Sequence, residues 1–148
     1  MREILFRGKR CDNGEWVQGF YIRADHHWHN NGIHKDWITL GASANGGWFA
    51  LHNKYAVKAE TVGQFTGLTD KNGQKIFEGD IVAQNWYDHN EPEDDSFGEV
   101  VFCEYDCSFS VIDVEKDCIV PLGKCHAYYW EAEVIGNIHD NPELLENP

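Results

Sequence analysis

Short runs of apolar and aromatic residues, separated by turn signals, recur along the whole chain. In the run from 108 to 114, for example, Phe109 and Val111 share one parity and Ser110 has the other, which is the two-residue period of a β-strand. No stretch sustains the 3.6-residue period of an amphipathic helix, so the pattern excludes a helical bundle and an α/β fold. Short strands at close spacing predict an all-β protein.

Turn signals separate the expected strands. Asp12-Asn13-Gly14 and Asp70-Lys71-Asn72-Gly73 predict hairpin turns, because Asn-Gly tolerates the positive φ that such turns require. Gly19 is expected to mark a bulge or a close approach within its strand, and Pro121 an edge strand. Outside the central hairpin, strands are expected over residues 4–11, 15–22, 37–40, 47–51, 55–58, 61–65, 80–86, 97–105, 108–114, 118–122 and 128–138. Loops are expected at 24–31, 41–46 and 87–96.

The stretch from 60 to 82 is expected to organise the rest as a strand, a tight turn, a second strand and the entry into a third. Phe65 and Leu68 before the turn, and Ile76 and Phe77 after it, supply apolar side chains to pack.

Together the elements predict a hairpin-rich N-terminal part over residues 1–63 and a small, SH3-like, partly open β-barrel over residues 64–148. A short helical turn at 140–145 closes the chain, with Asn141 as its cap and Pro142 at the first helical position.

The formal charge of −13 argues against direct binding to nucleic acid or to an anionic membrane, because both need Lys and Arg to neutralise phosphates. Residues 1–63 hold eight Lys/Arg and six Asp/Glu, a charge of +2, whereas residues 64–148 hold four and nineteen, a charge of −15. This asymmetry supports two parts, and one interpretation of it is that one half docks on the opposite half of another copy. The favoured interpretation is that the acidic residues only keep the surface soluble.

Five cysteines, no secretory pattern at the N-terminus and no apolar run of membrane-spanning length predict a cytoplasmic protein with reduced thiols. Three sets of residues carry candidate chemistry. Glu78 and Asp80 could bind a divalent cation, but acids at a turn that opens a strand favour a structural role. A second set could surround zinc: Cys103, Cys107, Cys118, Cys125 and His126. The third is a histidine cluster in the first long loop: His26, His27, His29 and His34.

Zinc sites in loops typically contain paired C-x-x-C knuckles, which this chain lacks. Buried thiols and a solvated histidine loop are therefore favoured. Cys125 and His126 are neighbours on an expected strand, where successive side chains diverge, so they make a poor catalytic dyad. The chain is therefore expected to have no catalytic, cofactor or metal residues.

Candidate partner-binding residues are aromatic in the N-terminal half and acidic in the loop expected at 87–96. They are Trp28, Trp37, Trp48, Asp88, Glu91, Glu93, Asp94 and Asp95.

Three segments carry a family resemblance: REILFRGKRCDNGEWVQGFYI at the start, VGQFTGLTDKNGQKIFEGDIV in the middle and EVIGNIHDNPELLEN near the end. In this order they resemble the YopX family of bacteriophage and prophage proteins. T-G-L-x-D-K-N-G and E-G-D-I-V in the middle segment are the most characteristic runs. The motif positions, expected to be structural, are Thr66, Gly67, Leu68, Asp70, Asn72, Gly73, Glu78, Gly79, Asp80, Gly136, Asn137, Asn141 and Pro142.

The resemblance implies a mostly β protein, encoded by a phage or prophage and present in the bacterial host cell, from a family without an established activity. We expect a non-enzymatic accessory protein that binds a protein partner or self-associates, without a cofactor. One alternative is an acidic decoy, with the stretch 88–95 imitating nucleic acid in front of a host protein. Another is a metal-dependent hydrolase that uses Glu78, Asp80 or the Cys/His set.

Overall fold

The computed structural model describes residues 3–23, 36–45, 48–88, 91–123 and 129–146, with side chains described outside 42–52 and 88–94. The chain is nearly all β, with antiparallel sheets and one short helix at the C-terminus, which confirms the predicted fold class. It divides into two compact units, Met1–Phe65 and Thr66–Pro148. The expected loop at 24–31 lies outside the described residues.

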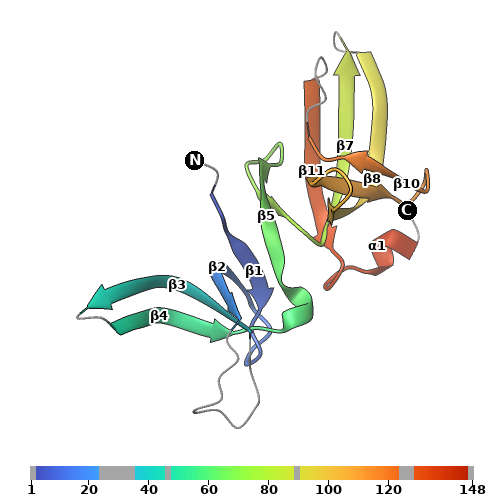
Figure 1. Ribbon diagram of the computed structural model, residues 1–148. Helices are drawn as coiled ribbons and strands as arrows, with labels where there is room; N and C mark the ends of the chain where they lie inside the picture. Colours follow the sequence, from blue (N-terminus) through green and yellow to red (C-terminus); the bar gives the residue numbers. More distant parts are fainter. Residues whose placement is uncertain (1–2, 24–35, 46–47, 89–90, 124–128, 147–148) are drawn as a thin grey trace. The chain divides into compact units, whose positions relative to one another are not determined.

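The elements follow in a simple order along the chain (Figure 1). They are β1 (Phe6–Lys9), β2 (Trp16–Arg23), β3 (Asp36–Asn45), β4 (Trp48–Ala56), the 3-10 helix η1 (Ala59–Thr61), β5 (Gly63–Thr69), β6 (Lys75–Phe77), β7 (Asp80–Asp88), β8 (Glu91–Cys103), β9 (Ser108–Asp113), β10 (Cys118–Pro121), β11 (Tyr129–Asn137) and α1 (Glu143–Glu146). No helical segment in the described part of the chain has the length and apolarity that crossing a bilayer requires.

The first unit is an antiparallel meander in which β1, β2, β3 and β4 pair in sequence, and the start of β5 returns to pair with β1. A Cβ added at Gly19 in β2 would lie 2.4 Å from the carbonyl oxygen of Thr39 in β3, so the predicted close approach is confirmed. Ile38 of β3 and Val57, which follows β4, are buried in this unit. Gly8 makes room for Val57, because a Cβ added at Gly8 would lie only 3.1 Å from the Cβ of Val57.

The turn predicted at 41–46 is wrong, because β3 continues to Asn45 and pairs with β4 as far as Trp48. Gly, Ser and Asn are common in turns, but a neighbouring strand that offers backbone hydrogen bonds along its length overrides such weak local preferences.

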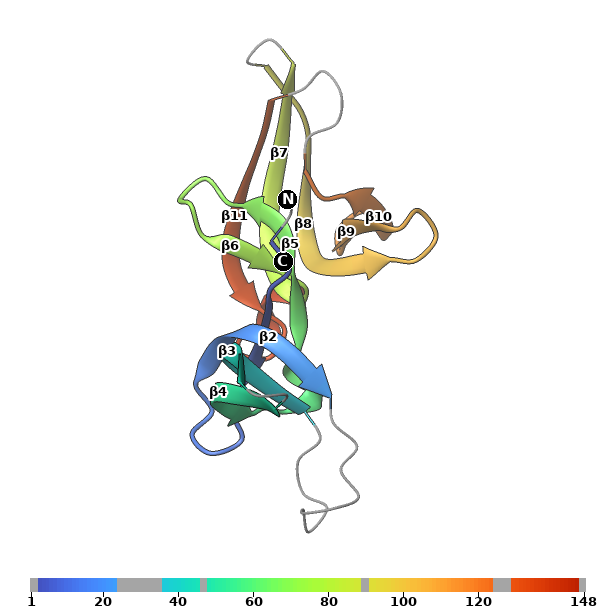
Figure 2. The same cartoon turned by 60° about the vertical axis from the view of Figure 1, so that its left-hand side comes forward.

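The loop predicted at 87–96 is also wrong. Residues 87–88 and 91–96 extend the long β7–β8 hairpin (Figure 2), with Asn85 opposite Asp95 and Asp88 opposite Glu91, while 89–90 lie outside the described residues. Five acids in a short stretch resemble a solvated loop, yet backbone pairing does not depend on side-chain charge. β7 supplies a partner for that backbone.

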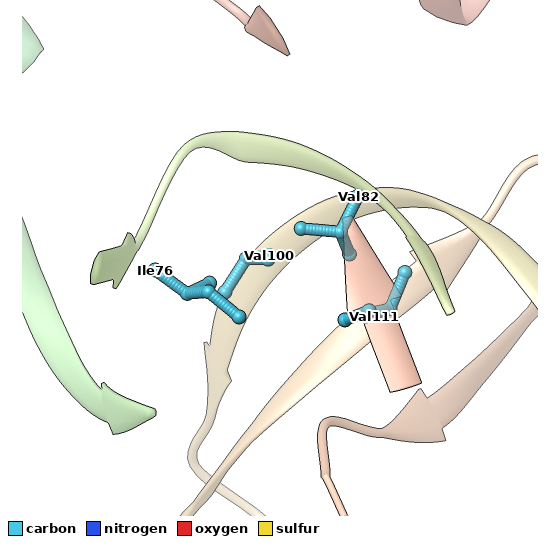
Figure 3. Packing of buried hydrophobic residues seen from close by; sticks show 5 residues of the cluster. Ile76, Val82, Val100 and Val111 are labelled. Atoms are coloured by element: carbon cyan, nitrogen blue, oxygen red, sulfur yellow. The ribbon is translucent and has the colours of Figure 1, made fainter. Parts of the chain in front are cut away.

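The second unit has the strand order β10-β9-β8-β7-β11, which is not closed into a barrel. Gly98 and Glu99 of β8 pair with both β7 and β9, at the place where β8 changes partner. The core consists of Ile76, Val82, Val100, Val111 and Ala132, each at most 2 % exposed. Figure 3 shows the labelled members of this cluster converging from separate strands.

Candidate functional site

The turn between β5 and β6 holds the edge of β11 through Asp70. One carboxylate oxygen, Oδ1, accepts the N–H groups of Asn72 and Gln74, each at 2.8 Å. The other, Oδ2, accepts the N–H of Val134 at 3.3 Å. Lys71 adds a backbone hydrogen bond to the Ala132 carbonyl at 2.8 Å. The middle and C-terminal family segments therefore meet in space at this buried carboxylate.

Asp70 is 6 % exposed. Burial by itself raises its pKa, but the N–H groups of Gln74, Val134 and Asn72 together lower the pKa below its ordinary value. The carboxylate is thus kept ionised by backbone donors, which is a structural use of an acid.

The E-G-D-I-V run forms a second tight connection. Asp80, 1 % exposed, accepts the N–H of Phe77 at 2.8 Å through Oδ2. Gly79 has φ +77°, which favours glycine, and it donates to the Val100 carbonyl at 2.8 Å while accepting from Ile138 at 2.9 Å. Glu78 is half-buried beside it. Asp80 and Gly79 thereby fix the entry into β7.

The C-terminal segment turns on Asn137, whose Oδ1 accepts the N–H groups of His139 and Asp140, each at 3.0 Å. Gly136 precedes it at a register shift of β11, where an added Cβ would lie 2.8 Å from Oδ1 of Asn141. After Pro142 the chain enters the one-turn helix α1, with Leu145 donating to the Pro142 carbonyl at 3.1 Å.

The remaining motif positions also serve the backbone or the core. Thr66 donates to the Ile76 carbonyl at 2.9 Å, Gly67 and Gly73 have positive φ, and Leu68 packs against the core cluster. The motif positions lie within residues 66–80 and 136–142, and we call these two segments together the signature joint.

The described cysteines, Cys11, Cys103, Cys107 and Cys118, are free thiols. Cys11 and Cys103 are half-buried, but Cys107 and Cys118 are exposed, so the expected burial is wrong for these two. Cys125, His126 and the histidines of 24–35 lie outside the described residues. Within the described ranges, no group of three or more His, Cys, Asp or Glu is placed to hold a metal ion.

Of the candidate partner-binding residues, Trp37 and Asp95 have side chains that the structure describes. Trp37 is half-buried in β3, with the Lys54 ammonium 5.0 Å from its ring centroid. Asp95 is exposed and pairs with Lys116, Nζ to Oδ1 being 3.1 Å. Trp28 lies outside the described residues, as do the side chains of Trp48, Asp88, Glu91, Glu93 and Asp94.

A buried polar network in the second unit was not predicted. Gln84, 1 % exposed, accepts from the Trp130 indole at 2.9 Å and donates to Ser96 Oγ at 2.9 Å and to the Pro121 carbonyl at 3.2 Å. Gln84 is two residues from both Val82 and Trp86, so a strand places its side chain on the same inward face as theirs. A polar residue at an inward position is the feature of the sequence that could have predicted this network.

Beside this network lies a hollow of about 180 Å³, where β7, β8 and the end of β9 meet. Its polar lining consists of Gln84, Asn85, Asp95, Ser96, Asp113 and Glu115. Asp113 is 1 % exposed.

On β9 and β10, Ile112 and Ile119 are cross-strand neighbours and are 40 % and 59 % exposed. Glu99 of β8 is opposite Ile112, and burial raises the pKa of its carboxyl. We call Ile112 and Ile119 the apolar row. Within the described residues β10 pairs with β9 alone, so this row reaches an edge of the sheet.

Comparison with known proteins finds a family model and a similar solved structure. The family model described as YopX protein matches residues 5–146. The crystal structure of protein EF1440 from Enterococcus faecalis is similar at 21% identity, covering 98% of this chain and 99% of that chain, with a TM-score of 0.47. A search of curated proteins finds no match.

Proposed function

This chain belongs to the YopX family. From that premise we propose that it is an accessory protein that acts by binding protein chains. The first partner that we propose is a second copy of itself. The observation that carries the proposal is the apolar row. Ile112 of β9 and Ile119 of the edge strand β10 are cross-strand neighbours, and association there would remove both from water.

The signature joint supports a binding role in a different way. Asp70, Asp80 and Asn137 direct their side-chain oxygens to N–H groups of their own chain. These motif residues thus stabilise the unit that presents the apolar row.

The division of charge sets how this association responds to salt. Each copy carries −13 overall, and the apolar row lies in residues 64–148, which carry −15, so two copies repel one another at long range. Salt screens this repulsion, so association through the row should strengthen as ionic strength rises.

Sedimentation velocity of the purified chain tests the proposal. We expect reversible association for the wild type and a shift to monomer for Ile119→Lys, because a charge at the edge opposes pairing. Ile4→Lys is the matched control, since Ile4 is also 59 % exposed but lies in the first unit. Circular dichroism verifies that each variant is folded. A strictly monomeric wild type, or equal association of both variants, would contradict self-association through the row.

A further inference from the structure

One acidic side chain lies in line with the apolar row. Cross-strand pairing aligns Ile81 of β7, Glu99 of β8, Ile112 of β9 and Ile119 of β10. Residues directly opposite one another in antiparallel strands point to the same face of the sheet, with their Cβ atoms roughly 5 Å apart. Glu99 is therefore a carboxylic acid in a line of three isoleucines, directly beside the apolar row.

The exposed fraction along this line rises toward the edge of the sheet. Ile81 is fully buried, whereas Ile112 is 40 % exposed and Ile119 is 59 % exposed. Glu99, between the buried and the exposed isoleucines, is half-buried. A second copy that covered the apolar row would therefore remove water from the Glu99 carboxyl as well.

Within the described residues, Glu99 accepts no hydrogen bond and forms no ion pair. Phe97 and Val101, its neighbours on the same face of β8, are apolar. Asp80 and Asp113 adjoin its two cross-strand partners along the chain, and the alternation of a strand points their side chains to the other face.

The charged residues that share this face are farther away. Glu133 lies on β11 with β7 in between, and its carboxylate pairs with the Lys71 ammonium at 2.5 Å. Asp95 is four residues along β8, roughly 13 Å away, and pairs with Lys116. Burial alone raises the pKa of the Glu99 carboxyl, with no contribution from a charge among the described residues.

We propose that Glu99 is a pH switch for self-association: two copies join through the apolar row when Glu99 carries a proton, and they dissociate when it is ionised. This inference rests on the proposed self-association. An ionised carboxyl covered by a second copy loses water without gaining a partner, which is costly, whereas the neutral acid loses far less. In a symmetric dimer both copies bring this carboxyl to the contact.

The direction of the pH dependence follows from linkage. Because covering Glu99 raises its pKa further, association takes up protons and strengthens as the pH falls. Between pH ~5.5 and ~7.5 ordinary glutamates, with a pKa of ~4.3, stay ionised. In this range the dissociation constant should fall by up to about tenfold per pH unit for each carboxyl that takes up a proton.

Sedimentation velocity at fixed ionic strength, at pH ~7.5 and ~5.5, tests the switch. Wild-type association should tighten at least about tenfold between these two values. Glu99→Gln keeps the shape of the side chain without its charge. It should associate at the higher pH about as tightly as the wild type does at the lower pH, and change less than about threefold between them.

Glu104→Gln is the matched control, because it removes the same charge from an exposed residue of the turn after β8. It should keep the pH dependence of the wild type. The eight histidines also titrate in this range, and they remain in both variants, so their effect is common to both. Circular dichroism verifies that each variant is folded. The double variant of Glu99→Gln with Ile119→Lys should be monomeric at both pH values, which assigns the association to the row.

Carbon-13 NMR of the Glu99 carboxyl provides a readout that needs no variant. Its titration midpoint should lie above ~4.3 in dilute protein and should move to higher pH as the protein concentration rises, because linkage is reciprocal. A midpoint that does not depend on concentration would overturn the switch.

The outcomes separate this inference from the proposal on which it rests. Equal pH dependence of the wild type and Glu99→Gln, or association that weakens as the pH falls, overturns the switch. Self-association through the row still stands in that case if Ile119→Lys is monomeric. Monomers of both the wild type and Glu99→Gln at both pH values would contradict self-association itself, and the switch with it.

Discussion

Both units of this protein bury polar residues, but their polar and aromatic groups make different contacts. In the first unit, cations lie over aromatic rings: the Arg7 guanidinium is 4.7 Å from the Trp16 ring centroid, and that of Arg10 is 4.4 Å from the Tyr55 ring centroid. In the second unit, polar groups such as Gln84 are buried and bonded within an apolar core.

This difference predicts which amino-acid substitutions each unit tolerates. Cation–π contacts at partly exposed positions contribute individually and adapt to small movements. A buried polar network depends on all its members, and an apolar core is close-packed, so a small displacement there is felt widely. Three substitutions test this contrast.

The largest effect is expected at the strand glycines. A Cβ at Gly98 in the second unit would lie 1.7 Å from the carbonyl oxygen of Ile112, so Gly98→Ala must displace the β9 backbone. We expect a loss of at least about 3 kcal/mol of unfolding free energy, measured by urea denaturation. Gly41→Ala in the first unit is the matched control, because its added Cβ meets no described atom within 4 Å. Equal stability of the two variants would contradict the contrast.

The next effect concerns Asp70. Asp70→Ala leaves three backbone N–H groups without their acceptor and should lower the unfolding free energy by about 2–4 kcal/mol. Hydrogen exchange should show the loss of protection in the second unit. Asp12→Ala, an exposed turn acid of the first unit, should leave exchange unchanged. Loss of protection spread equally over both units would argue against this local role.

Asp70 also predicts a dependence on pH. Because its pKa is lowered in the folded state, its contribution is fully present above the ordinary carboxyl pKa of ~3.9 and is lost as pH falls through the folded value. Denaturation midpoints measured across this acid range should therefore fall less steeply for Asp70→Ala than for the wild type. Parallel curves would show that Asp70 is not preferentially ionised in the folded chain.

The smallest effect is expected for Trp16→Leu in the first unit. The substitution removes the ring that faces Arg7 and Lys9 and should cost about 1 kcal/mol. Phe20→Leu, on the same strand and 56 % exposed, is the control and should change the thermal midpoint less. A loss as large as that of Gly98→Ala would mean that Trp16 belongs to a close-packed core.

Much of the fold followed from local features of the sequence. The hairpin turns at Asp12–Gly14 and Asp70–Gly73, the edge position of Pro121 and the close approach at Gly19 were all predicted. The full extent of β3 and of the β7–β8 hairpin was not predicted. Residues there have local preferences for turns and loops, and only pairing with a neighbouring strand makes them extended.

The sequence by itself determined most of the extended stretches and the reversals at the two Asn-Gly turns, but not the full extent of β3 or of the β7–β8 hairpin. Side-chain parity and tolerance of positive φ are properties of a few adjacent residues. Only the tertiary structure decided which strands become neighbours. Pairing of distant strands carries the carboxylate of Asp70 to Val134, 64 residues away, and aligns Gly98 with Asp113. The burial of the Asp113 carboxylate, 1 % exposed, is a result of that pairing, since burial depends on what the rest of the chain places around a residue.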